Sequence, residues 1–184
     1  SIGQGYTLVT PMQLAEAVAT LANGGLMIQP RLIQSIKNSQ TGKMEVFKNK
    51  VVQELHFKPE NLALVKEGMM NVTQPGGTAA SVGAGAPYKI AAKTGTAQVV
   101  EMKANQKYNP NRMNERHRDH ALFIAYAPAE EPTIAVAIIV ENGGHGGSTA
   151  GPIARKLMDY YLLKKVSSNK EESKVGPLES EYHD

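Results

Sequence analysis

The stretch Ala91-Ala92-Lys93-Thr94-Gly95-Thr96-Ala97 places a cation, two hydroxyls and a glycine on one short piece of backbone. The lead-in Tyr88-Lys89-Ile90, which has apolar side chains on either side of Lys89, predicts that this piece is a β-strand. Because side chains alternate between the two faces of a strand, the hydroxyls of Thr94 and Thr96 are expected on the same face. Gly95 has no side chain, so a ligand can approach the backbone closely there. Such a strand can bind a carboxylate through its hydroxyls and offer a backbone N–H to a developing oxyanion.

The bulk composition is that of an ordinary globular domain. The 184 residues are enough for one domain with a buried core. The longest apolar run, Ile134 to Val140, is too short to span a bilayer. The net charge of +3 comes from scattered lysines and arginines, which argues against nucleic acid as a partner. The chain has no cysteine, which excludes disulfides and thiol chemistry.

Helix and hairpin signals precede the strand. The capping box Thr10-Pro11-Met12-Gln13 opens a first helix, and Lys58-Pro59-Glu60 opens a second. Between them, residues 26–57 are predicted to form a hairpin whose strands are residues 31–36 and 44–47. These elements are interpreted as scaffold.

Two more strands come after the central one, at residues 121–126 and 133–140, and their short connection favours antiparallel pairing. The second of them is apolar almost throughout, as in a strand covered on both faces. With the strand at Lys93 they make an antiparallel sheet of at least three strands, flanked by helices. The sequence therefore predicts an α+β fold.

A closing helix is predicted over residues 150–165. Apolar side chains recur on its successive turns. The residues at these positions are Ile153, Leu157, Tyr160 or Tyr161, and Leu163 or Lys164. Residues 166–184 are rich in Ser, Glu and Lys with hardly any apolar residues, so a disordered tail is predicted there and the domain is assigned to residues 1–165.

Two polar segments each allow two interpretations. Gly3-Gln4-Gly5 could border a substrate groove, although a tight turn is favoured. The segment 101–119 is a long polar excursion between two strands. It is either a lid over the groove or a mobile surface loop, and the two interpretations have equal weight.

Lys-Thr-Gly is a motif of penicillin-binding proteins and β-lactamases, although three residues alone also fit a plain edge strand. The flanking segments 92–98 and 118–128 resemble those of the monofunctional, class B penicillin-binding proteins, most of all the enzymes of cell elongation. Other segments resemble the same family in the same order, namely Ser1-Ile2-Gly3-Gln4-Gly5, Thr10-Pro11-Met12-Gln13-Leu14-Ala15 and Asn23-Gly24-Gly25. The resemblance covers residues 1 to about 165 and implies the C-terminal portion of the penicillin-binding, serine transpeptidase fold.

The resemblance implies roles for the central strand. Lys93-Thr94-Gly95-Thr96 would be the catalytic segment, and its threonines, with Ala97 and Gln98, would bind substrate. The cation of Lys93 would set the electrostatics of the groove and contact the serine of a Ser-x-Asn turn. The two threonine hydroxyls would bind the carboxylate of a D-Ala-D-Ala stem peptide or of a β-lactam. The backbone N–H of Thr96 would be one donor of the oxyanion hole.

The same mechanism needs a serine nucleophile three residues before a lysine, and a Ser-x-Asn turn. The only matches to both overlap at Ser167-Ser168-Asn169-Lys170, in the predicted tail. The family carries the two motifs on separate elements before the Lys-Thr-Gly strand, so we reject these matches. The nucleophile is expected upstream of Ser1, and the chain, which does not open on Met, is expected to be an inactive piece of a longer protein.

A metal site is considered because His117, Asp119, His120 and His145 carry suitable ligand atoms. Two neighbouring arginines disfavour a cation, and neither a metal nor a cofactor is expected. Asp119 and His120 are instead interpreted as hydrogen-bonding residues at the groove edge or at a strand start.

The reaction implied by the resemblance is peptidoglycan D,D-transpeptidation, in which a serine ester forms from one stem peptide and an amine of a neighbouring strand attacks it. The implied location is the periplasmic side of the bacterial inner membrane, with the anchor outside this chain. The implied partners are a membrane glycan polymerase and a cell-shape scaffold protein. The alternatives are a D,D-carboxypeptidase or β-lactamase-like serine hydrolase, and a penicillin-sensing or interaction module without turnover.

Overall fold

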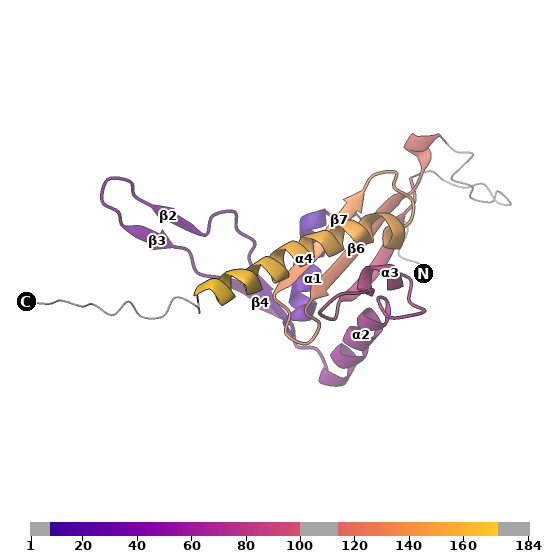
Figure 1. Ribbon diagram of the computed structural model, residues 1–184, viewed down its shortest axis with the longest axis horizontal. Coiled ribbons are helices and arrows are strands. Elements are labelled where there is room, and N and C mark those ends of the chain that lie inside the picture. Colours follow the sequence, from indigo (N-terminus) through magenta and orange to yellow (C-terminus); the bar gives the residue numbers. More distant parts are fainter. Residues whose placement is uncertain (1–7, 100–113, 173–184) are drawn as a thin grey trace, which may run out of the picture.

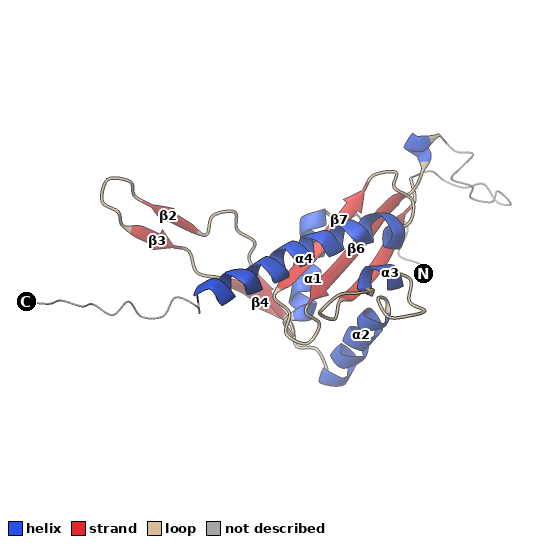
Figure 2. Cartoon of the chain, viewed as in Figure 1, coloured by secondary structure: helices blue, strands red, loops and turns tan. Residues whose placement is uncertain are grey.

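The computed structural model of the chain describes residues 8–99 and 114–172, with side chains up to residue 164 (Figure 1). The elements, in order, are α1 (Pro11–Ala22), β1 (Leu26–Ile28), β2 (Ser35–Lys37), β3 (Met44–Val46), β4 (Val51–Glu54), α2 (Pro59–Asn71), α3 (Ala80–Gly83), β5 (Ala91–Ala97), a 3-10 turn η1 (Glu115–His117), β6 (His120–Ala127), β7 (Ile134–Val140) and α4 (Gly146–Glu172). Figure 2 shows helices on both sides of a central sheet. The mixed helix and antiparallel-sheet architecture confirms the predicted α+β class.

The central sheet has the strand order β5-β6-β7, and both pairs are antiparallel. The strand of the Lys-Thr-Gly motif begins at Ala91, three residues later than the apolar lead-in predicts. The reason is that the lead-in bonds elsewhere. The carbonyl of Lys89 accepts a hydrogen bond from the N–H of Ala129, in the β6–β7 connection, at 2.9 Å, and the Tyr88 hydroxyl bonds to α4.

The sheet separates two hydrophobic cores. On one face, α4 lies across the sheet (Figure 1) and shares with all three strands a cluster that includes Ala92, Phe123, Val136, Ala154 and Met158. On the other face, α1 and α2 contribute to a second cluster, formed by Val18, Ala22, Met69, Ala91, Tyr126 and Ala129. Successive residues of β5 therefore face opposite cores, as strand alternation requires.

Helix α1 begins where the sequence predicts. The Gln13 backbone N–H donates to the Thr10 hydroxyl at 3.2 Å, and the Gln13 side-chain carbonyl accepts from the Thr10 N–H at 2.8 Å. This reciprocal pair satisfies two backbone groups that the first helical turn leaves without intrahelical partners. The predicted capping box is confirmed.

The region predicted as one hairpin contains two separate antiparallel strand pairs. Strands β1 and β4 pair close to the body of the molecule, and β2 and β3 pair further out. Figure 1 shows the β2–β3 hairpin projecting away from the sheet. The second predicted strand agrees with β3, but the first is wrong in extent, because residues 35–37 pair with β3 and residues 31–34 lie before the paired strand. The backbone pairing extends one residue further, because the Gln34 carbonyl accepts a 2.9 Å hydrogen bond from the Phe47 N–H.

The apolar side chains that recur along the last helix do not form its buried face. Ile153 and Leu157 are 43% and 47% exposed, whereas Ala150, Ala154 and Met158 are fully buried against the sheet. The buried face is mostly one of small residues, which lets the helix axis approach the strands closely. Apolar side chains on the other face lie in solvent in this structure.

Helix α4 also has different bounds from those predicted. It begins at Gly146 rather than at residue 150, and it continues to Glu172 instead of ending at residue 165. The rest of the predicted tail, residues 173–184, lies outside the described residues. Among the helices that the structure describes, none is both long and apolar enough to cross a bilayer.

Candidate active site

Strand β5 lies at an edge of the central sheet. Within the described ranges it pairs with β6 along its whole length, and its other side carries no strand. Lys93 is exposed, Thr94 to Ala97 are half-buried, and Gln98 is exposed just beyond the end of the strand. The segment that the sequence singles out is therefore an accessible wall rather than a core strand.

Lys93 lies on the α1 side of the sheet, in the same alternation as Ala91. Its side chain is exposed, and its ammonium donates a 2.7 Å hydrogen bond to the carbonyl oxygen of Thr94. The cation thus lies against the backbone of its own strand, next to the residues that would bind substrate.

The threonine hydroxyls belong to the opposite face. Ala92 is part of the α4 core, so Thr94 and Thr96 share that side, in agreement with the predicted alternation. A Cβ atom built on Gly147, in the first turn of α4, would lie 3.3 Å from the Thr94 methyl carbon. The cation and the hydroxyls of the motif therefore lie on different faces and can act on one ligand only at the free edge of the strand.

The N-terminus of α4 packs directly on the motif. A Cβ atom built on Gly146 would overlap the carbonyl oxygen of Leu122 and lie 2.7 Å from that of Gly95. At Gly95 itself, an added Cβ would meet the Leu122 Cβ at 3.1 Å. A side chain at Gly95 would therefore require Leu122 to shift, and Gly146 is the tighter of the two glycines.

A residue that sequence reasoning missed is Thr78. Its hydroxyl oxygen lies 3.3 Å from that of Thr94, although the two are 16 residues apart. Thr78 comes after two glycines that follow α2, and Gly76 has a φ of +87°, which side chains rarely adopt. The glycine pair was the available signal, since it marks a tight turn that fixes the position of Thr78.

The segment before β5 is clamped to α4. The Tyr88 hydroxyl donates to Oδ1 of Asp159 at 2.5 Å, and Arg155 Nε contacts both oxygens of the same carboxylate at 2.9 Å. Burial, together with the hydrogen bond to Asp159, raises the pKa of Tyr88. Partial burial alone would raise the pKa of Asp159, but the hydrogen bonds from Tyr88 and Arg155 outweigh it and lower that pKa.

His120 makes the predicted kind of contact at the start of β6. Its Nδ1 accepts a 2.9 Å hydrogen bond from the N–H of Asn142, whose φ is +54°. The Gly144 N–H donates to the carbonyl of the buried Asp119 at 2.8 Å. These bonds fix the β7–α4 connection beside the sheet. In the part of the chain that the structure describes, no three His, Asp or Glu side chains gather as metal ligands would.

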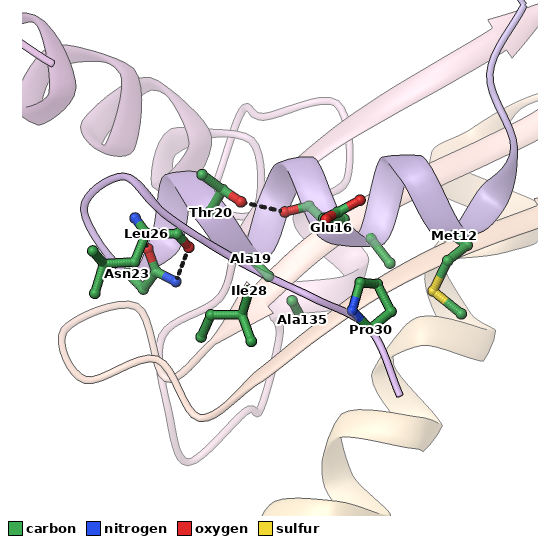
Figure 3. Close-up of a pocket in the computed structure, with 10 residues that line it drawn as sticks. Met12, Glu16, Ala19, Thr20, Asn23, Leu26, Ile28, Pro30 and Ala135 are labelled. Atoms are coloured by element: carbon green, nitrogen blue, oxygen red, sulfur yellow. Dashed lines mark hydrogen bonds between the residues drawn. The ribbon is translucent and has the colours of Figure 1, made fainter. Parts of the chain in front are cut away.

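A cavity of about 290 Å³ lies elsewhere, between α1, β1 and β7 (Figure 3). Its polar groups are partly tied to backbone, since Thr20 donates to the Glu16 carbonyl at 2.8 Å and the Asn23 amide donates to the Leu26 carbonyl at 2.7 Å. Ala135 of β7 forms part of its wall. Strand β7 is two strands from β5, or about 10 Å, so the cavity is separate from the Lys-Thr-Gly wall.

Two predictions fall partly or wholly outside the described residues. Gly3-Gln4-Gly5 lies outside them, and so do residues 101–113 of the polar excursion interpreted as either a lid or a surface loop. Residues 114–119 are described and contain the 3-10 turn η1. Asn114 caps this turn, because its side chain accepts a hydrogen bond from the Arg116 N–H.

The sequence matches known proteins over most of its length. The family described as "Penicillin binding protein transpeptidase domain" matches residues 1–159. The peptidoglycan D,D-transpeptidase MrdA of Escherichia coli K12 is 43% identical over 166 residues, which are 88% of this chain and 25% of that protein. The chain thus spans about a quarter of the length of this curated relative.

Solved structures agree with the family match. The crystal structure of Pseudomonas aeruginosa PBP2 in complex with WCK 5153 has a TM-score of 0.70 and 39% identity, covering 100% of this chain and 35% of that one. The complex between PBP2 and MreC from Helicobacter pylori has a TM-score of 0.63 and 30% identity, covering 88% of this chain and 26% of that one. With the family match and the exposed Lys-Thr-Gly edge strand, these likenesses establish that the chain belongs to the penicillin-binding protein transpeptidase domain family, among its class B, PBP2-like members.

Proposed function

We propose that this chain forms the Lys-Thr-Gly wall of a peptidoglycan D,D-transpeptidase active site that is also the target of β-lactams. The observation that carries the proposal is the accessible edge of β5, which brings the cation of Lys93 and the hydroxyls of Thr94 and Thr96 to one edge of the sheet. The D,D-transpeptidase name of its relative supports the same activity.

In the proposed reaction, a serine hydroxyl attacks the carbonyl carbon between the two D-Ala residues of a stem peptide. The serine oxygen forms an ester, and the terminal D-Ala leaves with the proton that the serine lost. An amine of a neighbouring stem peptide then attacks the ester carbonyl and forms an amide, and the serine oxygen leaves with a proton from the amine. The hydroxyls of Thr94 and Thr96 bind the substrate carboxylate. The Thr96 N–H stabilises the oxyanion, and loss of one such donor costs roughly 2.7–4 kcal/mol of transition-state stabilisation.

We propose that the nucleophile comes from polypeptide outside these 184 residues. Gly147 lies beside Thr94, and Ser167 is on the same helix 20 residues further along, which corresponds to about 30 Å at 1.5 Å per residue. A serine at that distance cannot attack a substrate bound on β5. This geometry supports the rejection of Ser167 as nucleophile.

We further propose a periplasmic location at the inner membrane, together with a cell-shape scaffold protein and a membrane glycan polymerase as partners. The PBP2–MreC complex supports a scaffold partner for this class of protein. The assembly would place the wall formed by β5 near newly made glycan strands.

Labelling with a fluorescent penicillin tests the proposed function. A longer protein that carries this chain after its serine-containing part should be labelled covalently, whereas the 184-residue chain alone should not. Lys93→Ala should lower labelling of the longer protein about a hundredfold. Lys89→Ala, at an exposed lysine that pairs with Glu130 at 2.7 Å, is the matched control and should leave labelling unchanged.

The products separate the possible activities. Incubation of the longer protein with a pentapeptide donor and an amine acceptor should give cross-linked product. Release of D-Ala without cross-linking would assign a D,D-carboxypeptidase instead. Labelling of the short chain alone would overturn the assignment of the nucleophile.

A further inference from the structure

We propose that Thr78 is a positioning residue for Thr94, an inference that rests on the proposed function. The two hydroxyl oxygens lie 3.3 Å apart, within hydrogen-bond distance. Thr78 belongs to the turn after α2, so it is outside the Lys-Thr-Gly motif in sequence and beside it in space. Its hydroxyl is placed to fix the rotation of the Thr94 hydroxyl.

The direction of the hydrogen bond decides what the pair can do. A threonine hydroxyl carries one proton and two acceptor lone pairs, and an ionised carboxylate only accepts. When Thr78 donates to the Thr94 oxygen, the Thr94 proton is left for the substrate carboxylate. A bound carboxylate favours this arrangement, because a hydrogen bond to a charged acceptor is stronger than one between neutral groups.

The backbone around Thr78 is held on both sides. The Gly77 N–H donates to the Gln74 carbonyl at 2.8 Å, and the Ala79 N–H donates to the Val72 carbonyl at 2.9 Å. A Cβ atom on Gly147 of α4 would come within 2.5 Å of the Thr78 carbonyl oxygen. The turn is therefore held between the end of α2 and the start of α4, which fixes the position of the Thr78 hydroxyl opposite Thr94 of β5.

The test uses the longer protein with Thr78→Val and Thr78→Ser, and two probes: a penicillin with its free carboxylate and the methyl ester of the same penicillin. Thr78→Val keeps the shape of the side chain and removes its proton donor. It should lower the second-order acylation rate constant for the free acid about tenfold, as expected when the Thr94 hydroxyl is no longer held in the orientation that donates to the carboxylate, and leave the constant for the ester unchanged. Thr78→Ser should restore acylation by the free acid to near that of the unsubstituted protein.

Each other outcome contradicts the proposal in a distinguishable way. Equal acylation of the valine variant and the unsubstituted protein would overturn the positioning role alone. An equal fall for acid and ester would assign Thr78 a merely structural role. No acylation of the unsubstituted protein would overturn the proposed function and this inference with it.

Discussion

The hydroxyl of Tyr88 and the carboxylate of Asp159 form a 2.5 Å hydrogen bond that joins the segment leading into β5 to the middle of α4. Arg155 extends this contact, because its Nη1 also donates to the carbonyls of Val82 and Ala84 at 2.7 and 3.1 Å. One cluster of three side chains therefore ties α3, the lead-in and α4 together. It joins the segment that precedes the Lys-Thr-Gly strand to the helix that packs on one face of the sheet.

Tyr88→Phe should lower the free energy of unfolding by about 1–2 kcal/mol, because it removes the donor and leaves the carboxylate with one partner fewer. Chemical denaturation measured by circular dichroism gives the size of the effect. Tyr160→Phe is the matched control, since Tyr160 is the neighbour of Asp159 on α4 and is 65% exposed. Equal stabilities of the two variants would show that the Tyr88–Asp159 bond contributes nothing measurable.

Stability should depend on pH through Asp159. Its pKa is lowered in the folded chain, so the unfolded chain binds a proton more readily. The stabilisation is therefore fully present above the unfolded pKa of about 3.9 and is lost as the pH falls through the lower folded value. The difference in unfolding free energy between the unsubstituted chain and Asp159→Asn should shrink between pH 7 and pH 3. A difference that stays constant over that range would contradict the assignment.

Two adjacent residues of α4 differ sharply in burial. Met158 is fully buried and Leu157 is 47% exposed. Met158→Ala should lower the free energy of unfolding by about 2–5 kcal/mol, through lost burial and a cavity. Leu157→Ala should cost less than about 1 kcal/mol in the same denaturation measurement. The reverse order would mean that the helix packs through its other face.

Gly146→Ala should destabilise the chain by roughly 3 kcal/mol, because the new methyl group would overlap the Leu122 carbonyl and push α4 away from β5. Gly68→Ala is the matched control. An added Cβ at Gly68 meets nothing within 4 Å, and the position is inside helix α2, so alanine should stabilise by about 0.5–1 kcal/mol. Thermal unfolding of both variants measures the contrast, and a neutral Gly146→Ala would show that α4 is free to shift.

The sequence by itself determined the parts of this protein that local chemistry controls. The Thr10–Gln13 capping box is satisfied within one helical turn, so its residues suffice to predict the helix start. Short connections and apolar composition likewise predicted the antiparallel pairing of β6 with β7. The order of motifs around Lys93 indicated the family, because that order is written directly in the chain.

Only the tertiary structure decided which faces of these elements meet. Apolar residues such as Leu157 recur along α4, yet the sheet packs against the face of Ala150 and Ala154, since small residues allow closer packing. The pairing of Thr78 with Thr94 depends on how a turn after α2 is wedged against α4, a contact between segments that are remote in sequence. Sequence periodicity describes one helix or strand at a time. These contacts depend on how two or three such elements are placed relative to one another, and the packing of the core determines that placement.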